Sequence, residues 1–156
     1  FNAYILPHID YCCTIWGNTD KKIINEIIKF QKRAARVILD VQDFDTPSDV
    51  LFNKLQWMKF DKRVEYKKSI LVYKSLNDNH FPRYMQHKFT KLNQVHSCNL
   101  RSITNEELYV PSPNFEFSRK SLAYSGPKIW NEIPKAVRKS DTRNKFQNAY
   151  IKWQYP

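Results

Sequence analysis

Asp43 and Asp45 are the acidic residues of this chain whose spacing comes nearest to that of a catalytic metal site. A site that transfers phosphoryl groups with two metal ions needs carboxylates that hold the ions a few ångströms apart, commonly adjacent Asp residues after an aromatic residue on a hairpin. Asp43-Phe44-Asp45 is instead expected in a turn between two helices, without a third acid in a strand. We therefore predict a solvated turn here and no catalytic residues.

Four residues that could bind zinc lie in one segment, namely His80, His87, His96 and Cys98. Structural zinc sites bring their ligands in close pairs such as Cys-x2-Cys. His96 and Cys98 are separated by a single residue, which is too tight for the usual pair, and no second pair of standard spacing is present. The spacing favours surface histidines without a metal, and we expect no metal site and no cofactor.

Glycine is scarce, with only Gly17 and Gly126 in 156 residues. The sharp turn of a G-x-S-x-G nucleophile, the phosphate loop of nucleotide hydrolases and the dinucleotide-binding loop all need closely spaced glycines. None of these motifs is present in the sequence, so we expect no enzymatic activity from this chain. Few glycines also leave little room for tight β-turns, which favours a mainly helical fold.

The charge balance is strongly basic, with 26 Lys and Arg against 15 Asp and Glu, a net charge of +11. Such a chain attracts polyanions over a long range, and nucleic acid is the first candidate partner. A soluble basic domain without specific ligands is the alternative. An anionic membrane is less favoured, because the basic helices also carry apolar faces of the buried type. The 42% hydrophobic residues are enough for a core.

Three cysteines do not make a disulfide framework, and no apolar stretch is long enough to cross a bilayer. A reducing, intracellular compartment fits this usage. Cys12 and Cys13 lie in an apolar context and are expected to be small buried side chains. The chain starts at Phe1 without a leader, so we expect a piece of a longer polypeptide.

The segment from Lys21 to Asp40 has the period of an amphipathic helix. Its apolar residues recur at intervals of three and four, and we expect them to be buried near Trp16 and Trp57; they are Ile23, Ile24, Ile27, Phe30, Ala34, Val37 and Ile38. At about 100° per residue, five cations share the opposite arc, and they are Lys22, Lys29, Lys32, Arg33 and Arg36.

Two further helices are expected before residue 80. Thr46-Pro47-Ser48-Asp49 predicts a helix start, in which Thr46 caps the helix, Pro47 takes its first position and Asp49 is the acid of a capping box. A short helix should run from there to about Leu55. A longer helix should run from Asp61 to about Leu76. Its inner residues are expected to be Val64, Leu71, Val72 and Leu76, and its outer residues Lys62, Arg63, Lys67, Lys68 and Lys74.

Periodicity fades between Phe81 and Phe117, where prolines and polar residues accumulate. This segment is expected to be a long irregular connector with at most a short β-hairpin, from strands at Leu108 to Val110 and Phe115 to Phe117. After it we expect a break at Gly126-Pro127, a short helix through Trp130, and a last helix from Thr142 to Trp153. The predicted fold is thus a small, mainly α domain.

Nucleic-acid binding is predicted from cations on helix faces, which neutralise phosphates. The candidate binding residues are Lys22, Lys29, Lys32, Arg33, Arg36, Lys67 and Lys68. Aromatic side chains could stack unpaired bases, but the four tryptophans stand in apolar runs and are more simply core residues.

Short motifs along nearly the whole chain follow an order and spacing that resemble a known family. They are Tyr4-x2-Pro7-x2-Asp10-Tyr11, Ile15-Trp16-Gly17, Ile27, Phe30 to Ile38, Leu55-Gln56-Trp57, Tyr73-Lys74, Pro82-x-Tyr84, Arg101, Val110-Pro111, Arg119-x-Ser121, Tyr124 with Gly126, Trp130-Asn131-x-Ile133-Pro134 and Phe146. This set resembles the C-terminal region, thumb and tail, of the reverse transcriptases of non-LTR retrotransposons, the jockey-like and chicken-repeat-like LINE polymerases.

The pattern along the chain predicts three parts: a helical part at residues 1–80, the connector at residues 81–118 and a C-terminal helical part at residues 119–156. The resemblance implies that the first part is thumb-like or post-thumb. In this family the catalytic Asp residues lie upstream, in the palm. The resemblance therefore implies a non-catalytic fragment of an RNA-directed DNA polymerase, with RNA or DNA and the palm and fingers of the parent polypeptide as partners, in the nucleus and cytoplasm.

Two hypotheses follow. In the first, the tail binds template RNA or target DNA through its basic helix faces. In the second, it is a structural module that packs on the polymerase core, or a decayed or co-opted relic, and its cations are merely solvated.

Overall fold

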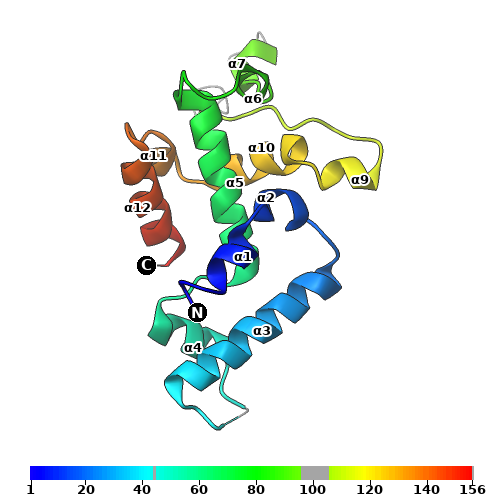
Figure 1. Ribbon diagram of the computed structural model, residues 1–156. Helices are drawn as coiled ribbons and strands as arrows, with labels where there is room; N and C mark the ends of the chain where they lie inside the picture. Colours follow the sequence, from blue (N-terminus) through cyan, green and yellow to red (C-terminus); the bar gives the residue numbers. More distant parts are fainter. Residues whose placement is uncertain (44, 96–105, 156) are drawn as a thin grey trace. The chain divides into compact units, whose positions relative to one another are not determined.

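A computed structural model describes residues 1–43, 45–95 and 106–155. Within these ranges the chain forms eleven helices and one isolated antiparallel β-bridge, between Lys91 and Leu108 (Figure 1). The prediction of a small, mainly α fold is confirmed. None of the helices in the described ranges is long and apolar enough to cross a membrane.

The chain divides into two compact units, Phe1–Glu65 and Tyr66–Pro156, and each is described by itself. The division falls inside helix α5 (Phe60–Asn77), upstream of the boundary at residue 80 that the sequence suggests. The part of α5 up to Glu65 therefore belongs to unit 1 and the rest of the helix to unit 2.

Unit 1 is organised around helix α3 (Lys21–Leu39), which confirms the predicted helix to within one residue. The Asp20 carboxylate accepts the backbone N–H of Lys22 at 3.2 Å and so caps the start of the helix. Asp40 adopts a left-handed conformation with φ 51° and ends it. The other helices of the unit are α1 (Leu6–Asp10), α2 (Cys13–Trp16) and α4 (Ser48–Leu55), and α4 lies beside α3. The predicted cap at Thr46 is wrong, because α4 begins at Ser48, directly after Pro47, and no side chain caps its N-terminus.

Two apolar clusters anchor α3. One surrounds the buried residues Cys13, Phe60 and Val64, and Trp16, Ile24, Ile27 and Ile28 pack against it. The other surrounds Ala35, Leu51 and Phe52, and Leu39, Val41, Leu55 and Trp57 pack against it. The expectation that α3 packs near Trp16 and Trp57 is thus confirmed.

The side of α3 that faces the core differs from the predicted one. Ile23, Phe30, Val37 and Ile38 are 51%, 48%, 82% and 50% exposed, although all four were expected to be buried. Gln31 and Ala35 are buried instead. The buried side is rotated by roughly a quarter turn from the centre of the apolar arc, because that arc is wider than the surface that the rest of unit 1 can cover.

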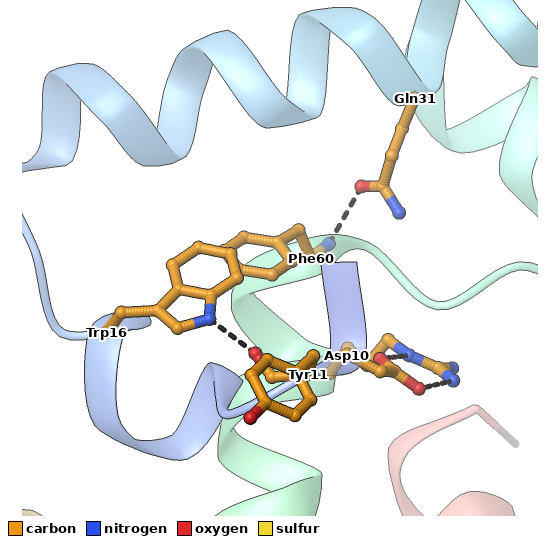
Figure 2. A network of polar contacts seen from close by, with 6 residues as sticks. Asp10, Tyr11, Trp16, Gln31 and Phe60 are labelled. Carbon is orange, nitrogen blue, oxygen red and sulfur yellow. Dashed lines mark hydrogen bonds and ion pairs between the residues drawn. The ribbon is translucent and has the colours of Figure 1, made fainter. Parts of the chain in front are cut away.

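A buried polar contact fixes this rotation. The Gln31 side chain accepts the backbone N–H of Phe60 through Oε1 at 3.0 Å, so it satisfies a donor at the first residue of α5 that has no partner inside that helix (Figure 2). The Phe60 ring stacks on Trp16, with ring centroids 5.2 Å apart. Gln31 therefore has to face the core, and it brings Ala35 with it, one turn along the helix.

The N-terminal segment of the chain is also held against the start of α5. Arg63 donates from Nε and Nη2 to the two carboxylate oxygens of Asp10, at 2.5 and 2.6 Å (Figure 2). The Trp16 indole N–H donates to the Tyr11 carbonyl at 2.6 Å. A Cβ added to Gly17 would lie 2.3 Å from the Cys13 carbonyl oxygen and 2.7 Å from a Val64 methyl, so this close packing requires glycine.

Unit 2 packs the rest of α5 against the C-terminal helices. These are α6 (Arg83–Gln86), α7 (Leu92–Val95), α9 (Glu116–Arg119), α10 (Leu122–Glu132), α11 (Lys135–Arg138) and α12 (Arg143–Gln154). Their core contains Val72 and Tyr73 from α5, Trp130 from α10, and Phe146 and Tyr150 from α12. The last helix was predicted correctly, because Thr142 caps it and its apolar residues keep one face.

Three sequence expectations fail in unit 2. Phe115 to Phe117 is not a strand, since the short helix α9 begins at Glu116. Gly126-Pro127 does not break the chain but lies within α10. Both residues are buried, and a Cβ on Gly126 would approach Phe89 and Val72 at 2.9 and 3.1 Å. Burial of the proline and this tight packing compensate for the backbone hydrogen bond that proline removes.

The third expectation that fails in unit 2 is the exposure of Lys68. This side chain was predicted to face solvent, yet it is only 2% exposed. Val64, Ser69, Ile70, Val72, Tyr73 and Ser75 are also buried, and these residues lie on nearly every side of α5. A helix that is buried on nearly every side has no polar face that a helical hydrophobic pattern can reveal. The prediction that Lys68 lies on an exposed face of α5 is therefore wrong.

The connector is held in place by side-chain amides. Asn131 bonds both backbone groups of Leu108, accepting its N–H and donating to its carbonyl, each at 2.9 Å. Gln86 Nε2 donates to the carbonyls of Asp78 and Phe81 at 3.1 and 2.8 Å. The described parts of the connector are thus held within unit 2 by polar contacts, which cannot be predicted from hydrophobic periodicity.

We predict that Gln31→Met will destabilise the fold by about 1–3 kcal/mol, because it keeps the side-chain volume but leaves the Phe60 N–H unsatisfied in the core. Urea denaturation measures the free energy of unfolding. Lys32→Met puts the same side chain at the adjacent, half-buried position and should change stability by less than about 0.5 kcal/mol. Equal effects of the two substitutions would contradict the role assigned to Gln31.

We also predict an alkaline transition that depends on Tyr73. Burial, followed by the charge of Asp141, raises the pKa of the Tyr73 phenol above its usual value of 10.0. The phenol O–H donates to the Ser140 carbonyl at 2.6 Å. Because the folded state holds this phenol neutral, its contribution to stability is complete below pH 10 and is lost as pH rises through the raised pKa.

The test compares unfolding free energies of the parent and Tyr73→Phe between neutral pH and pH 11 or so. The variant should be less stable by about 1 kcal/mol near neutral pH, where it lacks the hydrogen bond to Ser140, and should lose less stability at alkaline pH. Parallel pH profiles for the two proteins would refute the prediction.

Candidate nucleic-acid interface

The five cations predicted on α3 all lie on one side of this helix. Their order around the axis is Lys32, Arg36, Lys29, Lys22 and Arg33, within about 100°. Lys22, Lys29 and Arg33 are exposed, whereas Lys32 and Arg36 are half-buried. Along the helix, the row from Lys22 to Arg36 is about 21 Å long at 1.5 Å per residue. We call these five residues the basic row.

Glu26 lies beside the basic row. Glu26 accepts a hydrogen bond from the Lys29 ammonium at 2.8 Å, and both side chains are more than 60% exposed. This hydrogen bond, together with the positive charge of Lys29, lowers the pKa of the Glu26 carboxyl. Glu26 is therefore ionised at neutral pH, and it reduces the positive charge available to a polyanion at the middle of the row.

The rigidity of α3 gives the basic row a fixed geometry. Another side of the helix, roughly a third of a turn away, is held by Gln31 and Ala35 in the core of unit 1. A phosphate backbone that contacts the row meets cations whose Cα positions do not have to be ordered on binding, which lowers the entropic cost of binding. The row consists of Lys and Arg only, and cations clustered along a helix can bind the phosphates of any sequence.

The two remaining predicted residues do not extend the basic row. Lys67 and Lys68 belong to unit 2, whereas the row belongs to unit 1. Lys68 is buried, so its ammonium cannot act as an exposed phosphate contact, and we remove it from the interface. Lys67 is half-buried.

A group that the sequence reading did not single out lies at α9. Phe115 and Phe117 are 75% and 84% exposed, and an open hollow of about 470 Å³ is lined by Asn114, Glu116, Arg119 and Lys120. Exposed aromatic rings beside cations are the residue types that bind single strands. The order Phe-Glu-Phe-Ser-Arg-Lys carries this signal, but two Phe residues in alternation also fit the pattern of a strand, which is why the sequence predicts one here.

The candidate metal ligands do not assemble in the described ranges, where no group of three or more His, Cys, Asp or Glu side chains comes together. Asp43 makes a local turn instead: it accepts the Asp45 N–H and the Thr46 hydroxyl, each at 2.9 Å, and these contacts lower the pKa of its carboxyl. His96 and Cys98 lie outside the described residues. Cys13 is buried as expected, but Cys12 is exposed.

No protein-family model, curated protein or solved structure matches this chain. The case for a function therefore rests on the geometry of the chain itself.

We predict that Glu26→Gln will strengthen binding to RNA or DNA by a few-fold, because it releases Lys29 and removes an acid that contacts the row. One additional phosphate contact should steepen the plot of log K against log salt by a little under one unit. Glu132→Gln removes an exposed acid on α10 and is the matched control. Equal effects of both changes would show that only net charge matters.

Proposed function

We propose that this chain is a non-catalytic, nucleic-acid-binding region of a polymerase of the kind it resembles, the reverse transcriptases of non-LTR retrotransposons. In this proposal the basic row of α3 binds the phosphate backbone of RNA or DNA. The observation that supports it is the exposure of Lys22, Lys29 and Arg33 on one side of a helix whose other side is anchored in the core.

Electrostatics explains what such a region would contribute. A chain of net charge +11 attracts polyanions of every sequence, and its clustered cations release counterions from the phosphates that they contact. Binding should therefore be salt-dependent and weakly selective. This suits the tail of a polymerase, which must hold a template without reading it, while the palm of the parent polypeptide would supply catalysis.

A structural module is the second candidate function. The apolar residues that α3 leaves exposed, among them Phe30 and Val37, favour this alternative, since they are suited to contact with protein. In that case the basic row is an ordinary solvated surface and the partner is the palm or fingers of the parent polypeptide.

Changing Lys22, Lys29 and Arg33 together to Gln tests the first proposal. These side chains are exposed, so folding should be nearly unaffected. Binding should weaken for all sequences alike, and the slope of log K against log salt should flatten by about two units for single strands and nearly three for duplexes. Fluorescence anisotropy with labelled RNA, DNA and hybrid over a range of salt concentrations measures both quantities.

The matched control changes Lys54, Lys128 and Lys152 to Gln, three exposed lysines outside α3 that carry the same total charge. This control should lose much less affinity and keep most of the salt slope. If the α3 variant and the control behave alike, binding depends only on net charge. If the α3 variant keeps the parent's affinity and slope, the structural-module function is favoured.

A further inference from the structure

Five apolar residues of α3, three of them exposed and two half-buried, form a regular row of their own. Ile23, Ile27, Phe30, Ala34 and Val37 follow one another at intervals of four, three, four and three residues, the repeat of a coiled-coil seam. We call these five residues the apolar seam. It runs for about 21 Å along the helix, and Ile23, Phe30 and Val37 within it are 51%, 48% and 82% exposed.

The apolar seam is distinct from the side of α3 that packs in the core. On a helical wheel the seam spans about 80° and lies between the buried residues, such as Ala35, and the basic row. Ile27 is shared, since it also packs against the cluster around Phe60. Ala34, at the middle of the seam, is small enough to let a second helix approach closely, while Phe30 and Val37 can insert between the side chains of that helix.

We propose that the apolar seam binds an amphipathic helix that carries acidic residues beside its apolar face. The charge next to the seam selects this occupant. Arg33 and Lys22 are the nearest cations on one flank, and Glu26 on the same flank is already paired with Lys29. A docked helix with Glu or Asp facing that flank would form ion pairs, whereas a basic helix would be repelled.

The same charges argue against the other occupants. A second copy of the chain would bring two basic flanks and two net charges of +11 together. An anionic membrane would be attracted by the cations, but these border the seam on one side only, while the other side turns into the core through Gln31. A helix that lies in a membrane interface has its polar face opposite its apolar face. On α3 the apolar seam instead borders the side that packs in the core.

The test uses a synthetic peptide of about three heptads with Leu at its seam positions and Glu on its flanks. Two control peptides carry Lys in place of Glu, or Ser in place of Leu. The protein variant is Phe30→Ser with Val37→Ser, two exposed positions at which folding should persist, as circular dichroism verifies. Both substitutions leave every cation of the basic row unchanged.

The acidic peptide should bind the parent protein at least tenfold more tightly than either control peptide, and at least tenfold more tightly than it binds the variant. Binding of the variant to RNA should stay within twofold of the parent, which separates this inference from the nucleic-acid function. Failure of the acidic peptide to bind, or equal binding to the double-serine variant, would overturn the proposal.

Two further measurements address the other occupants. Vesicles of phosphatidylcholine and phosphatidylserine that bind the parent, but not the variant, while the peptide binds neither, would overturn the proposal in favour of a membrane. A concentration-dependent dimer in sedimentation that the variant abolishes would overturn it in favour of self-association. A monomer without vesicle binding supports the acidic helix as occupant.

Discussion

The hydrogen bond from the Phe60 N–H to Gln31 determines which side of α3 faces the core. It joins the middle of the longest helix of unit 1 to the first residue of α5, and the stacked rings of Trp16 and Phe60 lie next to it (Figure 2). Once Gln31 points inward, Ala35 must follow, and the small alanine lets Leu51 and Phe52 of α4 approach. The exposed apolar seam is a consequence of this rotation, and so is the half-burial of Lys32 and Arg36 in the basic row.

Helix α3 thus has three sides of different chemistry. One side is packed, one presents cations and one presents apolar residues to solvent. A helix in a small domain usually needs only the first, with the rest polar. Two exposed sides of different chemistry, next to each other on one rigid element, are consistent with two partners that bind along the same helix, a polyanion on one side and a protein helix on the other.

Much of the fold could be predicted from sequence, because local signals are strong where they exist. The bounds of α3 follow from a period of 3.6 and a capping Asp20, and those of α12 from Thr142 and the spacing of Phe146 and Tyr150. The basic row also follows from spacing alone. All of these properties are decided within a single helix.

What could not be predicted depends on partners distant in the sequence. The sequence of α3 does not indicate that Gln31 will accept the backbone N–H of Phe60. The prediction of which side of α3 is packed in the core was therefore wrong. Lys68 was placed outside because lysine usually is, but α5 is covered on nearly every side. Pro127 reads as a break until the packing of Gly126 against Phe89 is known.

The most direct test of the three-sided helix is hydroxyl-radical footprinting of α3 in the unmodified protein, read residue by residue by mass spectrometry. Isoleucines, which share one intrinsic reactivity, lie on different sides of this helix: Ile23 and Ile38 are about half exposed, whereas Ile24 and Ile28 pack against the cluster around Phe60. Ile23 and Ile38 should be oxidised several times faster than Ile24 and Ile28. Equal rates, or faster oxidation of Ile24 and Ile28, would contradict the orientation of α3 on which both proposed interfaces depend.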